Sequence, residues 1–461
     1  MNRIALVISA VVLVGGAARA WVSIPAERFG VGESIAAFAN GDWVTTATFY
    51  DSLPDLADNA VVRIDGATGG VVWLRELNVA DADDSRQVAI DSAGNVVTFN
   101  FLKGVVWKLD GATGQVLWQT DIGAFAQRGA FALDAHDDIL VGGATSAGPG
   151  SITHDLVVKL AGSIGATLWR VEGTGFDVVA LSVGAEGDAF AVSGDEAGTT
   201  AGPVTVRRLS GADGHAIWTT LMLPEGFTTV LVRGARLDGF GRFIVLIASR
   251  MRDGSDNFWE LRSLDADSGD LAWRTTIQGT SHDESFDSDR PSALAVSAGG
   301  TIYAVGTLGS PALQENFAVV ALDAASGDER WRHVLPKRGL VSGVASAVAI
   351  EPDGSPVVTG QTVGKKSDSG MFVCRLRPSD GQPLWETTVN LSSPYGLGDG
   401  VAVALDPNGN IGVAGILGYP PTDTRAAFVE LLPNGVSFEG LSIGLSRKGS
   451  DVEVHASPYF R

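Results

Sequence analysis

The chain has 461 residues, of which 33 are basic and 53 acidic, so its formal net charge at pH 7 is −20. An acidic surface repels phosphate groups, which argues against nucleic acids and anionic membranes as partners. The single cysteine, Cys374, excludes a framework of intrachain disulfides and lies in the apolar run MFVCRL, where we expect a small buried hydrophobe.

The N-terminus has the three parts of a secretory signal. Arg3 gives a positive start, residues 4–14 are apolar, and ARA at residues 18–20 is a small-residue cleavage site. We predict a cleaved signal peptide at residues 1–20 and a secreted or periplasmic mature protein that begins near Trp21. No cysteine lies near the cleavage site and no later apolar run reaches about 18 residues, so neither a lipoprotein nor a membrane span is expected. An uncleaved anchor is the alternative.

One short motif recurs at intervals of about 50 residues, which is a spacing typical of propeller repeats. Its clearest copies are IDGATGGVVW, LDGATGQVLW, LDADSGDLAW and LDAASGDERW. The aspartate can accept a backbone N–H as an Asx-turn, and the glycine four residues before the tryptophan can adopt a positive φ. Each copy therefore predicts a β-hairpin that ends on a tryptophan: Trp73, Trp118, Trp169, Trp218, Trp273, Trp331 and Trp385.

A second hairpin precedes each of these, with Gly, Asn or Asp between two apolar runs, as in VAIDSAGNVVTF and VALDPNGNIGVAGI. Two hairpins give four strands per repeat, which we name a to d in chain order, and eight repeats fill residues 33 to about 440. We predict an all-β fold, a β-propeller of eight four-stranded blades. It forms a single domain over residues 21–461 with an irregular segment at 441–461, and seven blades is the alternative count.

The motif tryptophans are interpreted as structural, blade-docking residues and not as cofactor ligands. A single blade cannot bury both of its faces, and a tryptophan near the outer strand is well placed to pack on the next blade. The eighth repeat, VELLPNGVSFEG, has no tryptophan, and Phe438 is its nearest aromatic residue. Strands near residues 21–24 or 452–455 are the candidates for completing it.

The pattern D-x-x-T-G-x-x-x-W resembles the tryptophan-docking repeat of the quinoprotein (PQQ)-like propeller family. That family includes quinone-dependent dehydrogenases and the outer-membrane assembly lipoprotein of the BAM complex, and the hairpins are also similar to seven-bladed bacterial propeller repeats. The resemblance covers nearly all of the mature chain and implies a propeller fold, but a fold does not define an activity.

For a quinone-dependent dehydrogenase, the resemblance implies a vicinal cysteine pair beside the cofactor and a calcium site. Cys374 is the only cysteine, so this pair is impossible and we expect no cofactor. The six histidines are scattered, without the spacing of a zinc site, so no metal ligands are assigned. No G-x-S-x-G elbow occurs, and no catalytic residue is assigned.

Basic residues recur in the third strand, one position before the Leu or Ile of the turn: Arg63, Lys108, Lys159, Arg208 and Arg375. They allow two interpretations. They could form an anion site, or their stems could cover the blade flank while the charge reaches water or a neighbouring carboxylate. We favour the second interpretation.

Antiparallel strands place the a–b and c–d turns at one end of each blade and the b–c and d–a connections at the other. Only the b–c and d–a connections vary widely in length, and variable loops on a rigid scaffold commonly bind partners. The densest acidic runs lie there, and we interpret them as a possible partner face: Asp81, Asp83, Asp84, Asp283, Glu284, Asp287 and Asp289. Calcium binding is the weaker alternative, because neither run matches a calcium-loop pattern.

The leading functional hypothesis is an exported, non-catalytic scaffold that binds an unknown protein or an envelope or polysaccharide component. We expect a monomer. One alternative is an enzyme that uses the central funnel, either a quinone-linked dehydrogenase or a polysaccharide lyase or hydrolase. The other is a structural or adhesive surface protein.

Overall fold

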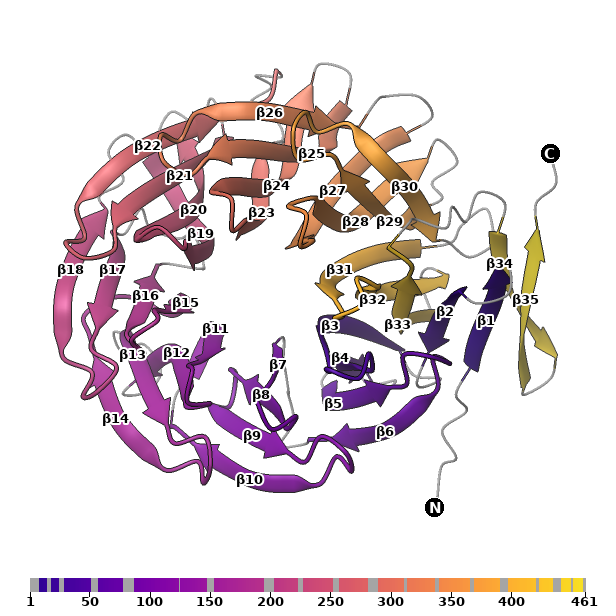
Figure 1. Cartoon of the computed structure of the whole chain (residues 1–461), viewed down its shortest axis with the longest axis horizontal. Helices are drawn as coiled ribbons and strands as arrows, with labels where there is room; N and C mark the ends of the chain where they lie inside the picture. Colours follow the sequence, from indigo (N-terminus) through magenta and orange to yellow (C-terminus); the bar gives the residue numbers. More distant parts are fainter. Residues whose placement is uncertain are drawn as a thin grey trace. The chain divides into compact units, whose positions relative to one another are not determined.

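The computed structural model describes residues 8–14, 18–24, 29–50, 57–77, 87–123, 125–146, 153–194, 203–222, 227–251, 257–280, 289–310, 313–335, 340–364, 369–389, 397–419, 423–433, 441–448 and 451–458. In these ranges every helix or strand element is a β-strand, and the strands form the eight four-stranded blades of a β-propeller, with one extra strand at the edge of the last blade and a separate two-stranded sheet (Figure 1). The predicted fold class is confirmed, and the seven-blade alternative is wrong. The described residues include no helix long and apolar enough to cross a membrane.

Contacts divide the chain into two compact units. The first comprises Met1–Ile90, Gly111–Gln115 and Leu335–Arg461, and the second comprises Asp91–Asp110 and Val116–Val334.

In the first unit, blades 1 and 7 each follow one continuous stretch of chain. Blade 1 is β3 (Phe29–Ala37), β4 (Trp43–Tyr50), β5 (Ala57–Ile64) and β6 (Val71–Glu76), and blade 7 is β27 (Leu340–Ile350), β28 (Pro356–Gly364), β29 (Ser369–Leu376) and β30 (Pro383–Val389).

Blade 2 is the sheet β10-β9-β8-β7, with β7 (Val88–Ile90), β8 (Val96–Asn100), β9 (Val105–Leu109) and β10 (Val116–Asp121). Blades 3 and 4 follow as β11 (Phe125–Leu133), β12 (Ile139–Ser146), β13 (Thr153–Leu160) and β14 (Thr167–Glu172), then β15 (Val178–Val183), β16 (Ala189–Ser193), β17 (Val204–Leu209) and β18 (Ala216–Met222). Blades 5 and 6 are β19 (Phe227–Leu237), β20 (Arg242–Met251), β21 (Asn257–Asp265) and β22 (Leu271–Ile277), then β23 (Arg290–Val296), β24 (Thr301–Ser310), β25 (Leu313–Asp323) and β26 (Glu329–Val334).

Blade 8 combines strands from both ends of the chain. Its sheet has the order β1-β2-β33-β32-β31, with β1 (Ile8–Val14), β2 (Ala18–Ile24), β31 (Leu397–Leu405), β32 (Ile411–Tyr419) and β33 (Asp423–Leu431). The first of the two candidate segments for completing the eighth repeat, residues 21–24, is therefore confirmed. The second candidate lies in β35 (Asp451–Pro458), which forms a separate two-stranded sheet with β34 (Leu441–Lys448).

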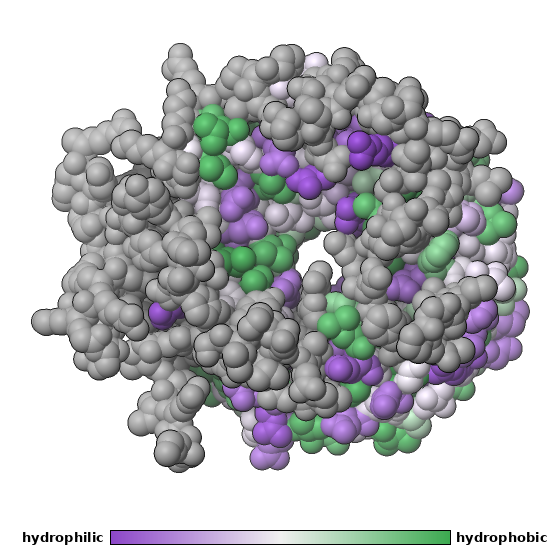
Figure 2. Space-filling model, turned by 180° about the vertical axis from the view of Figure 1, so that it is seen from behind, coloured by the Kyte–Doolittle hydropathy of each residue, from purple (hydrophilic) through white to green (hydrophobic). Residues whose placement is uncertain are grey.

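Burial explains why the strands of a blade differ in sequence. Every residue of β8 and β9 is buried, and these strands read VVTFN and VVWKL. The outer strand β10, which reads VLWQTD, alternates between half-buried and exposed residues. Hydrophobic and hydrophilic side chains accordingly lie next to one another along the described part of the outer margin at the lower right of Figure 2. Strands covered on both faces need continuous apolar sequence, whereas strands with one wet face do not.

The turns follow the predicted chemistry. The seven glycines four residues before the motif tryptophans all have φ between 68° and 76°. Asp265 and Asp323 accept backbone N–H bonds from the residue two positions on, at 3.0 and 2.7 Å. Among the described residues Asp137 is the one non-glycine with a positive φ, 62°, at a turn position where other blades carry glycine. Its Oδ1 accepts the N–H of Ser92 from blade 2 at 3.0 Å, so the carboxylate has a structural use that glycine would lose.

The hydrophobic core consists of layers between neighbouring blades. In the second unit, Phe190 and Val206 of blade 4 pack in one cluster with Phe243 and Val245 of blade 5. In the first unit, one cluster joins buried residues of blade 1 to Phe428 of blade 8. Each such layer needs both blades, so a blade gains its stability from its neighbours.

Candidate functional site

The indole N–H of a motif tryptophan is donated to the next blade. The acceptor is a backbone carbonyl in the c–d turn of that blade or, in blade 8, one that follows the third strand β33. The Nε1···O distances run from 2.9 to 3.3 Å: Trp73 to Gly111, Trp118 to Gly162, Trp169 to Gly211, Trp218 to Ala266, Trp273 to Ala324 and Trp385 to Pro433. Trp331 is 8% exposed, and the centroid of its ring lies 5.8 Å from the centroid of the Tyr303 ring.

The turn glycine of the next blade lies against the same indole ring. A Cβ atom added to Gly114 would come within 2.7 Å of the Trp73 ring, and one added to Gly165 within 2.6 Å of the Trp118 ring. Real Cβ atoms do not approach other atoms this closely. The glycine is therefore required twice, for its positive φ and for the space that the indole occupies.

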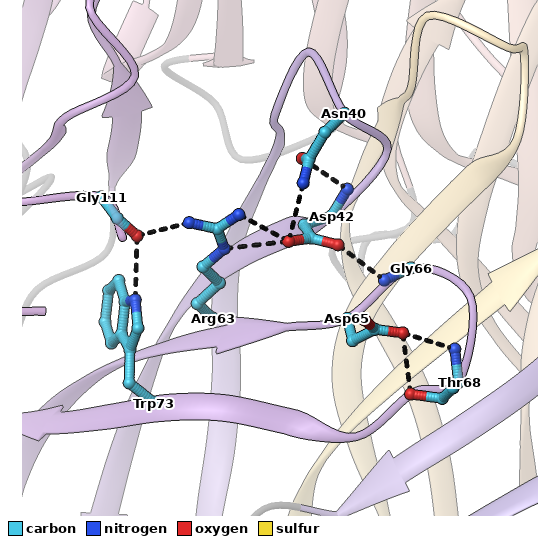
Figure 3. Close-up of polar contacts among 8 residues, drawn as sticks. All are labelled: Asn40, Asp42, Arg63, Asp65, Gly66, Thr68, Trp73 and Gly111. Carbon is cyan, nitrogen blue, oxygen red and sulfur yellow. Dashed lines mark hydrogen bonds and ion pairs between the residues drawn. The ribbon is translucent and has the colours of Figure 1, made fainter. Parts of the chain in front are cut away.

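The basic residues of the third strand point to the same carbonyls. Arg63 Nη1 donates to Gly111 O at 2.6 Å and also pairs with Asp42 Oδ2 at 2.6 Å through Nη2 (Figure 3). Asp42 in turn accepts the backbone N–H of Gly66 at 3.1 Å through Oδ1. One turn carbonyl thus receives two N–H groups, one from the indole and one from the guanidinium.

The same arrangement recurs in blades 2, 3, 4 and 7. Lys108, Lys159, Arg208 and Arg375 donate to carbonyls at 2.7–3.1 Å and pair with Asp91, Asp134, Asp188 and Asp353, each at 2.6–2.8 Å. The cations therefore reach neighbouring carboxylates, as the favoured interpretation predicts. An anion site built from them is not formed.

The ion pairs control the protonation of their carboxylates. Burial raises the pKa of Asp91, but hydrogen bonds from Lys108 and from Asn95 outweigh it and hold the pKa below its usual range. The same balance, with Lys159 as the cation, lowers the pKa of Asp134. Both carboxylates are thus held in their charged form by contacts within their own blade, and the same lysines also donate to a carbonyl of the next blade.

Glu430 is a site residue that the sequence analysis missed. It occupies the third-strand position in blade 8 that Arg63 or Lys108 occupies elsewhere, and the sequence signal was the carboxylate in VELLP where VVRID has arginine. Its side chain is 3% exposed, and its Oε2 accepts the indole N–H of Trp43 at 2.6 Å. Burial raises its pKa to about 8, opposed by the Trp43 hydrogen bond and assisted by the Asp406 and Asp65 carboxylates.

Asp155 and Arg207 form a second missed cluster, at the b–c/d–a ends of blades 3 and 4. Asp155 is 1% and Arg207 7% exposed, and their side chains form an ion pair. Asp155 also accepts the Gly175 N–H at 2.7 Å and the Ser193 hydroxyl at 3.0 Å. The cluster fixes the connection between β14 and β15. Because Asp155 and Arg207 are 52 positions apart, no local sequence pattern reveals the pair.

Most of the predicted partner face lies outside the described residues: Asp81, Asp83, Asp84, Asp283, Glu284 and Asp287. Asp289 is described, and its assignment to an exposed acidic surface is wrong. It is 1% exposed and accepts the backbone N–H groups of Gly279 and Gly309, both at 2.6 Å. This aspartate ties two connections together and does not present its charge to a partner.

The family sequence model described as "Outer membrane protein assembly factor BamB" matches residues 28–144 and 153–410. The chain belongs to this PQQ-like propeller family. The resemblance inferred from the tryptophan motif is therefore confirmed. No curated protein matches the sequence.

Solved structures share the fold at low identity. BamB from Moraxella catarrhalis is 15% identical, with 92% of this chain and 100% of that chain covered and a TM-score of 0.49. Sqt1 from Chaetomium thermophilum is 14% identical, with 88% and 96% covered and a TM-score of 0.58. Quinohemoprotein alcohol dehydrogenase from Comamonas testosteroni is 12% identical, with 89% and 76% covered and a TM-score of 0.55. At such identities the two structures with TM-scores above 0.5 establish the fold alone.

The described residues do not fit the cofactor site that the resemblance implies for a dehydrogenase. Cys374, the only cysteine, is fully buried in β29, where burial and the Glu386 carboxylate raise its pKa. It is thus the small buried hydrophobe that was predicted, and such a thiol is inert. Within the described ranges, no three His, Cys, Asp or Glu side chains are grouped to hold a metal ion.

Trp118→Ala should lower the free energy of unfolding by about 3–5 kcal/mol, because it removes a large packed ring and its hydrogen bond to the next blade. Trp118→Phe keeps most of the packing and should cost only about 0.5–1.5 kcal/mol. Urea unfolding followed by circular dichroism measures both. A loss below about 1 kcal/mol for the alanine variant would contradict a docking role.

Gly114→Ala should destabilise the protein more than Gly94→Ala. Both glycines have positive φ, at 69° and 80°, so both variants incur about 1–2 kcal/mol of backbone strain. Only the Gly114 variant also drives a methyl group into Trp73, since nothing lies within 4 Å of a Cβ at Gly94. Equal unfolding free energies for the two variants would show that the indole does not need this space.

Asp91→Asn should reduce the acid sensitivity of the fold. The folded-state pKa of Asp91 is lowered, so its stabilising contribution is present above the unfolded value of about 3.9 and is lost as pH falls through the folded value. The variant should be less stable than the wild type near neutral pH, and the difference should shrink in acid. Unfolding free energies at a series of pH values test this, and identical pH slopes would refute it.

Proposed function

We propose that the protein is an exported, non-catalytic propeller scaffold that binds another protein or a cell-envelope component through the b–c/d–a ends of its blades. The observation that carries the proposal is that the opposite ends of the blades, those with the a–b and c–d turns, are used for contacts that hold the propeller together. At the a–b/c–d ends, Trp73 and Arg63 donate to Gly111 of the next blade, while Asp42 pairs with Arg63 and accepts the Gly66 N–H within its own blade (Figure 3). Those polar groups serve assembly.

The b–c/d–a ends have the features of a binding platform. Their connections vary in length and sequence from blade to blade, whereas the hairpin turns are nearly uniform. Two buried carboxylates fix connections at this end. Asp155 accepts the Gly175 N–H in the β14–β15 connection, and Asp289 accepts the Gly279 N–H in the β22–β23 connection. Variable loops on a rigid base are suited to recognising a partner.

Membership in a family described by an outer-membrane assembly factor supports an extracytoplasmic role with a macromolecular partner. The d–a connections include the acidic runs at residues 81–84 and 283–287, whose charge would attract basic partners. Such attraction is screened over about 8 Å at physiological ionic strength, so binding should weaken as salt is added.

Neutralising the acidic runs should weaken partner capture without unfolding the protein. The loop variant carries Asn at Asp81, Asp83, Asp84, Asp283 and Asp287. The control variant changes the exposed hairpin-turn carboxylates Glu186, Asp270 and Asp328 to the corresponding amides. Immobilised proteins are incubated with the envelope fraction of the native host, and cross-linked partners are identified by mass spectrometry.

We expect the control variant to capture the same partners as the wild type and the loop variant to lose them. Loss in the control variant alone would show that the opposite blade ends bind. Undiminished capture by both variants would place recognition elsewhere on the propeller.

A further inference from the structure

The register of blade 8 assigns a role to Trp21. In every other blade the motif tryptophan pairs across the sheet with one fixed third-strand position, as in Arg63–Trp73, Lys108–Trp118 and Arg375–Trp385. In blade 8 the residue at this position is Glu430, and its partner in β2 is Trp21. The strand that completes blade 8 therefore brings a tryptophan to the same register position as the seven motif tryptophans.

The pairing with β33 begins at the predicted processing site. Trp21, Val22 and Ser23 pair with Glu430, Val429 and Phe428, whereas residues 18–20 pair only with β1. Removal of residues 1–20 would thus leave the part of β2 that blade 8 uses and no more.

Blade 8 also lacks the positive charge that five other blades carry at this position. Glu430 is buried, and in the described part of the chain its carboxylate has the Trp43 indole as a hydrogen-bond partner and no cation within ion-pair distance. Two further carboxylates, Asp406 in the β31–β32 turn and Asp65 in the β5–β6 turn, repel its negative charge and raise the pKa of Glu430 further. An anion in this setting is stabilised by a nearby cation.

We propose that cleavage between Ala20 and Trp21 completes blade 8, making Trp21 the eighth docking tryptophan and its new α-ammonium group the counter-ion of Glu430. A signal peptidase adds water across the bond: the C–N bond breaks, Ala20 leaves as a carboxylate, and the Trp21 nitrogen becomes an ammonium group at neutral pH. Paired Cα atoms lie about 4.5–5.5 Å apart in an antiparallel sheet, so the new charge forms within reach of the Glu430 side chain. The uncleaved amide carries no such charge.

The first test is the N-terminus of the protein secreted by its native host. Intact mass and N-terminal sequencing should give a chain that begins WVSIP. A folded protein that retains residues 1–20, or that begins after Trp21, would overturn the proposal.

The second test measures Tm for purified chains that begin at Trp21, with a free or an acetylated α-amino group, or that begin at Ala20. The acetylated chain keeps its length but loses the charge, and the Ala20 chain moves the charge about 3.3 Å along the strand. We expect both to melt a few degrees below the free Trp21 chain. Equal Tm values for all three would exclude the counter-ion.

Repeating these comparisons with Glu430→Gln identifies the partner of the charge. The differences between the three N-termini should vanish in this background, and if they persist unchanged, the ammonium group acts on another residue. For the indole, Trp21→Ala in the mature chain should lower Tm by an amount similar to Trp385→Ala, its equivalent in blade 7. An unchanged Tm for Trp21→Ala would exclude the docking role.

Discussion

Five blades (1, 2, 3, 4 and 7) donate both an indole N–H and a side-chain cation to one backbone carbonyl of the next blade. The carbonyl of Gly111 illustrates the constraint, since Trp73 and Arg63 both donate to it and both come from blade 1. A carbonyl oxygen has two lone pairs, and burial at a blade interface makes an unused one costly. These hydrogen bonds fix the position of the next turn against the indole ring. The turn residue that lies on the ring must then be glycine, because a Cβ atom there would clash with the indole.

The blades do not all form their ion pairs with a cation at the same third-strand position. Blade 5 has Ser263 at the usual cation position, and its ion pair lies within the a–b turn, between Arg242 and Asp238 at 3.0 Å. Blade 6 has Ala321 there, and Arg330 of the outer strand pairs instead with Asp323 at 2.7 Å. Blade 8 reverses the sign with Glu430. In blades 5 and 6 a cation from another position of the same blade thus pairs with a carboxylate at a turn, whereas Glu430 accepts the indole N–H of Trp43.

The use of polar side chains for contacts between blades limits where on the propeller a functional site can lie. The fold occurs both in a quinohemoprotein alcohol dehydrogenase and in a family described by an assembly factor, so the fold leaves the activity open. In the described part of this chain, motif indoles and third-strand cations at the hairpin ends donate to backbone carbonyls of the next blade. The connections at the other ends vary in length and sequence, and differences among propellers of this family are best sought there.

The sequence by itself determined the all-β fold, the four-stranded repeat and the turn geometry, because these depend on contacts between residues close together in the chain. The glycine at position 114 and its counterparts, with their positive φ, could be predicted from the turn motif alone. The fate of each charge could not. Packing decides whether Asp289 faces solvent or accepts two backbone N–H groups. It also decides whether Lys108 is free to bind an anionic ligand or pairs with the Asp91 carboxylate, because these segments are brought together only in the folded protein. The pairing of Trp21 with Glu430 joins the two ends of the chain, and only the tertiary structure decides that register, because no local pattern encodes which edge strand fills the last blade.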